Sequence, residues 1–289
     1  MGTPPQPDLE NFLHAPATDV AAIAPATVMF AAGGTRRDAV LNGHDVSHFN
    51  LPLADFSIRR MTETAGNFFK LGLRNVVSMA VRTTQLAETG PYRDYIIEGT
   101  IKTLGELALP YYRQLGCRVR LLCHDDIPEF AALADLLDTS TADAGPHTIW
   151  WIVARSNEQT WQRMIAAAQG ASSFAEVSQR YLGATIPPVS LFISFGKLFV
   201  SPELIPLPLF GEDVHCYFYQ RPGYSLSEQE IRSIIYDYAY QRKTWVSDKS
   251  GRYAGLESQR HIWNNGPILG LGRRVGGFWY PANAHDEEL

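Results

Sequence analysis

The stretch Val28-Met29-Phe30-Ala31-Ala32-Gly33-Gly34-Thr35-Arg36-Arg37 decides the fold of this chain. Its apolar run fits a strand buried on both faces, and the run stops at two glycines. Glycines let the backbone turn tightly and bring N–H groups close to an anion, while guanidinium groups match phosphate oxygens. The stretch therefore predicts a phosphate-binding site at the end of a buried strand. The alternative is a strand end with two solvated arginines.

Composition narrows the class of protein. The chain has 289 residues, 45% apolar residues and a formal net charge of −5, which allows a substantial core and does not fit a general nucleic-acid binder. Its three cysteines, Cys117, Cys123 and Cys216, have no metal-ligand spacing and cannot all pair. They indicate reduced thiols of a cytoplasmic protein. No apolar run reaches the ~18 residues of a membrane span, and the first residues have no signal-peptide pattern.

Six apolar segments predict strands that alternate with segments of helical periodicity. The predicted strands are Thr27–Ala32, Asn75–Val81, Arg118–Cys123, Thr148–Ala154, Ser190–Phe195 and Asp213–Tyr219. This alternation predicts the α/β class, with one parallel sheet of about six strands flanked by helices on both faces. Residues 1–25 are expected to form a loose N-terminal arm, residues 26–280 one domain and residues 281–289 a polar tail.

The segments between these strands predict helices and one loop. The expected helices are Asp55–Leu71, Tyr92–Leu115 with a bend at Pro110, Pro128–Leu137, Gln159–Gln169, Phe174–Leu182 and a late helix capped by Ser225 or Ser227. Asp38–Pro52 is polar and is expected to be a loop. It carries His44, Asp45 and His48, which suit either a metal or acid–base cluster or a solvated loop.

Ligands of parallel sheets bind outside the carboxyl ends of the strands. The turns after predicted strands one, two, three and five are therefore candidate sites: Gly33–Arg37, Arg82–Thr84, His124–Asp126 and Gly196–Lys197. The first is neither a P-loop nor a dinucleotide fingerprint, because it lacks Gly-Lys-Ser/Thr and a third glycine in register. The third suits a metal site or a helix cap. A serine hydrolase is poorly supported, since no Gly-x-Ser-x-Gly elbow is present.

Two further groups lie late in the chain. Tyr236, Tyr238, Tyr240 and Arg242 share a predicted helix, on which Tyr238 and Arg242 can meet on one face. They suit either a functional site or a partly buried helix or dimer surface. Arg273 and Arg274 in a glycine-rich stretch suit a second anion seat or a solvated tail.

Four stretches together resemble the cis-prenyltransferase (undecaprenyl diphosphate synthase) fold, and within it the branch of tuberculosinyl adenosine transferase and related bacterial diterpene synthases. They are Val28–Arg37, Val119–Leu122 with His124-Asp125, Leu191–Lys197, and Ile231–Arg242. The first resembles that branch's strand followed by Asp-Gly-Thr-Arg-Arg, and the third a strand that leads to a basic residue near the diphosphate. The resemblance covers roughly residues 25–280.

The resemblance implies an allylic prenyl diphosphate as substrate and a homodimer as the assembly. The diphosphate would bind Gly33, Gly34, Thr35, Arg36, Arg37 and Lys197. The prenyl chain would fill an apolar tunnel with Phe56, Phe68, Phe69 and Met79. Arg36, Arg37 and Tyr238 are the candidate catalytic residues, because cationic donors stabilise the leaving group and aromatic faces stabilise the cation.

One departure from the family pattern bears on the metal. The family has an Asp, which serves catalysis and Mg²⁺ binding, where this chain has Gly33, and the acidic residues after the second strand are replaced by Arg82-Thr83-Thr84. Three consequences stay open. The arginines ionise the substrate without Mg²⁺; Asp38, Asp45 or Asp94 holds the metal from a new position; or catalysis is lost.

The sequence therefore predicts a terpene synthase or prenyl transferase that ionises an allylic diphosphate, of the C20 diterpenoid class. The cation would be quenched by water, by proton loss or by another nucleophile. The alternatives are a non-catalytic subunit of a heteromeric prenyltransferase and a cis-prenyl chain-elongating enzyme, which is less well supported because elongation depends on the Asp replaced by Gly33.

Overall fold

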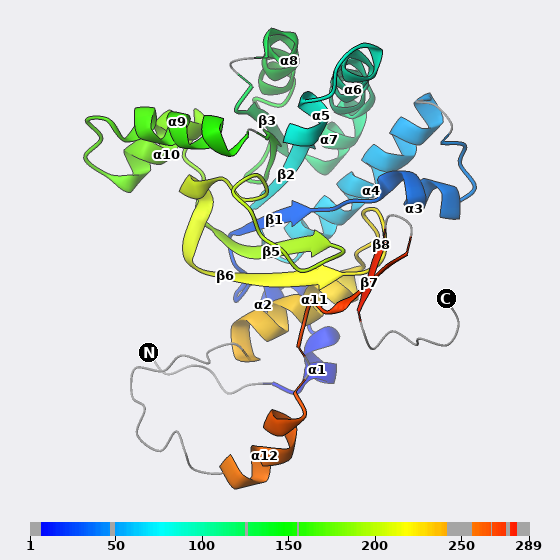
Figure 1. Ribbon diagram of the computed structural model, residues 1–289, viewed down its shortest axis with the longest axis vertical. Helices are drawn as coiled ribbons and strands as arrows, with labels where there is room; N and C mark the ends of the chain where they lie inside the picture. Colours follow the sequence, from blue (N-terminus) through cyan, green and yellow to red (C-terminus); the bar gives the residue numbers. More distant parts are fainter. Residues whose placement is uncertain are drawn as a thin grey trace.

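The computed structural model describes residues 7–46, 50–124, 127–154, 156–241, 256–266, 268–275 and 278–281. One parallel sheet of six strands lies at its centre, in the order β3-β4-β2-β1-β5-β6 (Figure 1). The strands are β1 (Thr27–Ala31), β2 (Asn75–Val81), β3 (Arg118–Leu122), β4 (Thr148–Val153), β5 (Val189–Phe195) and β6 (Phe210–Tyr219). The predicted α/β class and the single parallel sheet are confirmed.

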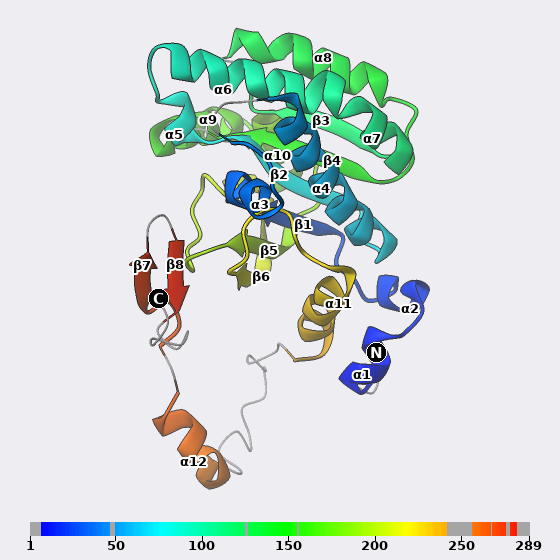
Figure 2. The same cartoon turned by 90° about the vertical axis from the view of Figure 1, so that its right-hand side faces the viewer.

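Helices cover both faces of this sheet (Figure 2). One face packs against α4 (Leu51–Lys70), α6 (Pro91–Lys102), η1 (Thr103–Leu107), α7 (Leu109–Leu115), α8 (Ala131–Ser140) and α11 (Glu228–Tyr236). The other face packs against α9 (Asn157–Ala168) and α10 (Phe174–Leu182). The remaining short elements are α1 (Leu9–Leu13), α2 (Ala17–Ala21), α3 (Thr35–Leu41), α5 (Thr83–Leu86), η2 (Pro128–Phe130), η3 (Leu207–Leu209) and η4 (Asp237–Gln241).

The central strand β1 shows why the apolar run in the sequence is continuous. All five of its residues are buried. Val28 and Phe30 point into the core under α4, whereas Met29 and Ala31 point into the core under α9 and α10. Successive side chains of a strand face opposite sides of the sheet, so a strand covered on both faces has no side chain in solvent and is mostly apolar.

The predicted loop Asp38–Pro52 is wrong at both ends. Helix α3 runs to Leu41, and α4 begins at Leu51, four residues before the expected start at Asp55. The start of α4 is set by Asn50, whose side chain accepts a hydrogen bond from the Leu53 N–H at 2.8 Å. Asn is a favoured N-cap residue, and proline in the first helical turn adds to this signal.

The predicted helix Tyr92–Leu115 is interrupted between α6 and α7. The break is at Gly105 in the π-helical turn η1, where φ is −86° and ψ is −111°, and not at Pro110. A Cβ atom at Gly105 would lie 3.2 Å from Leu133 Cδ1 of α8. The close approach of these two elements explains why glycine is found at the kink.

The described part of the N-terminal arm, residues 7–25, is packed on the domain rather than loose. Helices α1 and α2 bury Phe12 and Val20, and the Phe12 ring lies 5.3 Å from that of Tyr236 on α11. The Tyr236 hydroxyl donates to the Pro7 carbonyl at 2.9 Å, and the Arg232 guanidinium donates to the Ala15 carbonyl at 2.8 Å. These contacts attach the arm to the domain.

The C-terminal part contains elements that were not predicted. Helix α12 (Leu256–Asn264) follows the sheet domain, and β7 (Gly272–Val275) pairs antiparallel with β8 (Phe278–Pro281). Most of the predicted polar tail, residues 282–289, lies outside the described residues. Within the described part, no helix combines the length and the apolar character that crossing a lipid bilayer requires.

Phe68→Ala tests the core under α4. Phe68 is fully buried, and its ring lies 5.4 Å from that of Phe30 on β1. Loss of a buried phenylalanine typically lowers the free energy of unfolding by ~3–5 kcal/mol. Urea denaturation should show this loss, whereas Phe199→Ala, at a side chain 49% exposed, should change stability by less than ~0.5 kcal/mol. Equal effects of the two substitutions would contradict this packing.

Candidate functional site

The turn after β1 is closed by a hydrogen bond to the loop after β6. The Gly223 N–H donates to the Gly33 carbonyl at 2.6 Å. Gly34 has φ of +73°, and a Cβ atom there would lie 2.9 Å from Pro222 Cβ. Both the left-handed backbone and the close approach require glycine at position 34. Helix α3 begins directly after it.

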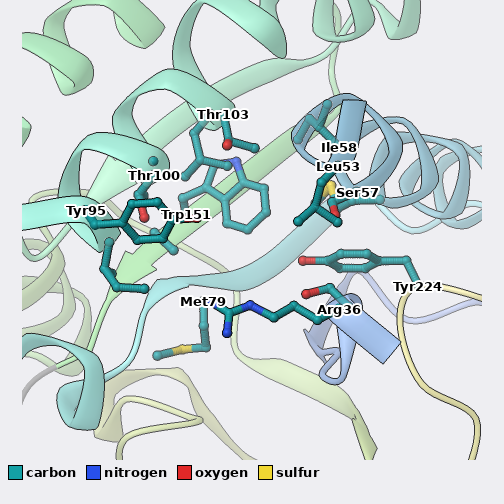
Figure 3. Close-up of a pocket in the computed structure, with 16 residues that line it drawn as sticks. Arg36, Leu53, Ser57, Ile58, Met79, Tyr95, Thr100, Thr103, Trp151 and Tyr224 are labelled. Carbon is teal, nitrogen blue, oxygen red and sulfur yellow. The ribbon is translucent and has the colours of Figure 1, made fainter. Parts of the chain in front are cut away.

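Helix α3 presents its first side chains at the carboxyl edge of the sheet. Thr35 and Arg36 line a cavity (Figure 3), and Arg36 is exposed. No carboxylate of the described residues forms an ion pair with the Arg36 guanidinium. Arg37 is half-buried and is not among the residues that line the cavity. The structure thus places one of the two arginines in the cavity mouth with its charge not neutralised by a carboxylate.

Asp38 points to the opposite side of α3. Its side chain is only 8% exposed, and Oδ2 lies 3.9 Å from Arg60 Nε. Asn42 Nδ2 donates to Asp38 Oδ1 at 3.2 Å. A Cβ atom at Gly223 would overlap the Asp38 carboxylate. Burial raises the pKa of Asp38, opposed by the Arg60 charge and the hydrogen bond from Asn42.

The cavity lies between α4, α6 and the carboxyl ends of the central strands (Figure 3). Its volume is about 210 Å³, which is below the ~300–1,000 Å³ range of small-ligand sites. Most of its lining is apolar, with hydroxyl groups from five helical residues and from Tyr224. The lining comprises Thr35, Arg36, Leu53, Ser57, Ile58, Met61, Met79, Ala80, Tyr95, Ile96, Gly99, Thr100, Thr103, Leu104, Trp151 and Tyr224.

Met79 alone of the four predicted tunnel residues lines this cavity. The position of the cavity against α4 agrees with the prediction, but a different part of the helix faces it, namely Leu53, Ser57, Ile58 and Met61. Phe56 contacts the His44 ring at 4.5 Å, Phe68 packs on Phe30, and Phe69 stacks on His147 at 4.6 Å. These three phenylalanines are buried in the protein core instead.

Trp151 forms part of the inner wall. It is 2% exposed, and its indole N–H donates to the Tyr112 hydroxyl at 3.0 Å. Tyr112 is itself fully buried. This hydrogen bond satisfies the only polar atom of the indole and fixes the ring that borders the cavity.

Trp151, Tyr95 and Tyr224 were not selected from the sequence. Trp151 lies in an apolar strand and Tyr95 on the apolar side of a helix, so the sequence pattern indicates a core position for both residues. For Tyr224 a signal was present. The residue follows Pro222-Gly223 at the carboxyl end of β6, and the same rule that selected the other strand-end turns applies to this one.

Other predicted site residues lie apart from the cavity. Lys197 follows Gly196 in the turn after β5, is exposed and does not line the cavity. Tyr238 lies in η4, where its ring packs 4.9 Å from that of His215. Arg273 and Arg274 are exposed on β7. Of the other candidates, His48, Asp125, Asp126 and Arg242 lie outside the described residues.

The carboxylates that the structure describes do not fit a Mg²⁺ site. No group of three or more His, Cys, Asp or Glu side chains gathers among the described residues. The space beside Gly33 is filled, since a Cβ atom there would lie 3.2 Å from Phe195 Cδ1. Asp38 is held by Asn42 and Arg60, and Asp94 is an exposed partner of Arg93 at 3.7 Å. Asp45 is likewise exposed.

Asp38→Asn should change the pH dependence of stability. Because the pKa of Asp38 is raised above its ordinary value of 3.8, the folded protein binds this proton more tightly than the unfolded chain does. Its contribution to stability is therefore present below about pH 4 and is lost as pH rises through the folded pKa. Denaturation from about pH 3 to about pH 7 should show wild type losing stability relative to the variant as pH rises.

Asp94→Asn is the matched control, because the Asp94 side chain is 69% exposed. It should keep the pH dependence of the wild type. If Asp38→Asn also follows the wild-type curve, the buried setting of Asp38 described above is incorrect.

Comparison with known proteins identifies one curated relative and a shared fold. The chain is 38% identical over 287 residues to (+)-kolavelool synthase of Herpetosiphon aurantiacus. The aligned residues cover 98% of this chain and 98% of that protein. No family model matches the chain. Lavandulyl diphosphate synthase from Lavandula x intermedia, solved with dimethylallyl diphosphate, superimposes with a TM-score of 0.58 at 12% identity, over 76% of this chain and 98% of that one.

A second solved structure has the same fold. A probable undecaprenyl diphosphate synthase from Campylobacter jejuni gives a TM-score of 0.56 at 14% identity, over 76% of this chain and 97% of that one. At these identities the two solved structures establish the fold alone. The full-length similarity to the Herpetosiphon protein establishes the family.

Proposed function

Because the chain belongs to the family of (+)-kolavelool synthase, within the cis-prenyltransferase superfamily, we propose that it converts an allylic C20 prenyl diphosphate into a diterpene alcohol. Membership of this family of terpene synthases and prenyltransferases favours an enzyme over the non-catalytic subunit considered from the sequence. The relative's name denotes an alcohol, which favours water as the nucleophile that captures the cation.

One observation carries the proposal. The Arg36 guanidinium, which pairs with no carboxylate of the described residues, and Thr35 line a cavity whose interior is mainly apolar. This arrangement matches an amphiphile with an anionic group at one end and a hydrocarbon chain at the other. Arginine is suited to the diphosphate end because its planar donors match phosphate oxygens.

The chemistry begins with ionisation of the substrate. The bond between C1 and the diphosphate oxygen breaks, and its electron pair leaves with the diphosphate. Donors from Arg36 and Thr35, assisted in this proposal by Arg37, stabilise the charge that develops on the leaving group. The aromatic faces of Trp151 and Tyr95 border the cavity and can stabilise the allylic cation. Water then adds to the cation, and the proton it loses goes to the released diphosphate.

The remaining expectations stay predictions. Lys197 and Tyr238 do not line the cavity. The roles proposed for them from the sequence therefore require that the bound substrate extends beyond the cavity. The homodimer and the cytoplasmic location are likewise expectations from the sequence.

Arg36→Ala should abolish most turnover. Loss of one donor to a developing oxyanion typically lowers kcat by ~10²–10³-fold. Purified protein is given geranylgeranyl diphosphate and bicyclic C20 diphosphates, with and without Mg²⁺, and the release of diphosphate and of terpenoid alcohol is measured. Arg118→Ala is the control, because Arg118 is exposed at the amino end of β3, on the opposite edge of the sheet.

Two results would count against the proposed function. If the wild type converts no C10–C20 diphosphate, the proposal that the protein is an enzyme is wrong. Full activity of Arg36→Ala would place the diphosphate at another site.

Thr103→Phe should shorten the cavity. Thr103 lines the cavity and lies on the opposite side from Arg36 in the view of Figure 3, so a larger side chain there removes space needed by the end of a long prenyl chain. Each methylene of the C20 chain that can no longer be buried loses ~0.8 kcal/mol of binding free energy, whereas a C10 chain still fits. The ratio of kcat/KM for C20 to C10 diphosphates should therefore fall by about tenfold or more. Thr84→Phe, at an exposed residue of α5, should leave this ratio unchanged. An unchanged ratio in Thr103→Phe would show that the chain lies elsewhere.

A further inference from the structure

Tyr224 is held in place by contacts from several elements that are distant in sequence. The Thr64 hydroxyl of α4 donates to the Tyr224 carbonyl at 2.6 Å. The preceding residue, Gly223, donates to the Gly33 carbonyl and accepts a hydrogen bond from the Tyr219 hydroxyl at 2.9 Å. The Tyr224 ring also packs 5.8 Å from that of Phe30 on β1. The loop therefore positions this side chain firmly.

The hydroxyl of Tyr224 is directed into the cavity and lies above the Arg36 side chain (Figure 3). No described residue forms a hydrogen bond with it. Tyr224 is half-buried, so the cavity leaves its hydroxyl accessible to a ligand. A fixed hydroxyl that faces a cavity without a protein partner is suited to a bound ligand.

Burial raises the pKa of Tyr224 to about 12. The phenol is therefore neutral throughout the ordinary working range of an enzyme. It can donate a hydrogen bond, but it is a poor candidate for a general base.

We propose that Tyr224 is a catalytic residue whose hydroxyl donates a hydrogen bond to the diphosphate oxygen that leaves from C1. This inference rests on the proposed function and adds a residue to its site. Tyr224 stands where the cationic mouth with Arg36 meets the apolar interior, which is where an amphiphilic substrate has its C1–O bond.

The hydrogen bond strengthens as the bond breaks. The electron pair of the C1–O bond moves onto the oxygen, which becomes a better acceptor, while the phenol keeps its proton. An interaction that is stronger in the transition state than in the bound substrate raises kcat. Its loss should therefore appear in kcat more than in KM.

Tyr224→Phe is the test, since it removes the hydroxyl and keeps the ring. We expect kcat for geranylgeranyl diphosphate to fall by about 10- to 100-fold, the size expected for a hydrogen bond to a charged group, with KM within about twofold of wild type. Thermal stability should change little, because no described residue bonds to the hydroxyl. Tyr217→Phe is the control, since the Tyr217 hydroxyl bonds to Asp237 at 2.6 Å and does not line the cavity.

Each outcome decides the role of Tyr224. Wild-type kcat in Tyr224→Phe, with loss of activity in Tyr224→Leu, would show that only the ring packing matters and would overturn the proposal. If Arg36→Ala is inactive while Tyr224→Phe has full activity, the proposed function stands and the role of Tyr224 does not. Should Tyr224→Phe fail to fold, 3-fluorotyrosine at position 224 gives a second measurement. Its ¹⁹F resonance should shift when inorganic diphosphate binds, and an unchanged resonance would contradict the proposal.

Discussion

The hydrogen bond from the Gly223 N–H to the Gly33 carbonyl, 2.6 Å long, is the interaction on which the candidate site depends. It joins the turn after the central strand β1 to the loop after the edge strand β6. The two segments are far apart in the sequence, and the parallel sheet brings both to its carboxyl edge. This contact links the start of α3 to the loop that carries Tyr224, which Thr64 and Phe30 also hold in place.

Helix α3 directs a positively charged and a negatively charged side chain to different places. Arg36 and Asp38 are two residues apart, and on a helix such residues point in different directions. The guanidinium of Arg36 reaches the cavity mouth, whereas the carboxylate of Asp38 is buried against Gly223 and near Arg60. If the carboxylate were in the mouth, it would neutralise the arginine and repel a diphosphate. The arrangement therefore keeps a positive charge available to an anionic ligand.

The sheet could be predicted from the sequence because its central strands are apolar runs covered on both faces, as β1 illustrates, whereas the edge strands β3 and β6 are partly exposed. Boundaries that depend on one side chain were less accessible. The start of α4 follows from the cap by Asn50, and the break before α7 follows from the packing of Gly105 against Leu133. Both depend on contacts or cap geometry that periodicity alone does not reveal.

Part of the candidate site could also be predicted, because ligands of parallel sheets bind at the carboxyl edge. Thr35, Arg36 and Met79 lie close to strand ends, and the carboxyl-edge rule led to the first two. The phenylalanines of α4 were misassigned, because the direction of each helix face relative to the sheet is set by tertiary packing. The carboxyl-edge rule could have indicated the loop that carries Tyr224, but the direction of its side chain depends on contacts with residues distant in the sequence, such as Gly33 and Thr64.

The position of the substrate can be determined from a crystal structure with a thiolo-diphosphate analogue of geranylgeranyl diphosphate, in which sulfur replaces the bridging oxygen and slows ionisation. We expect the phosphates to contact Thr35 and Arg36 and the hydrocarbon chain to lie between α4 and α6. A diphosphate bound at Lys197 or Arg273, or a hydrocarbon chain outside this cavity, would contradict this expectation.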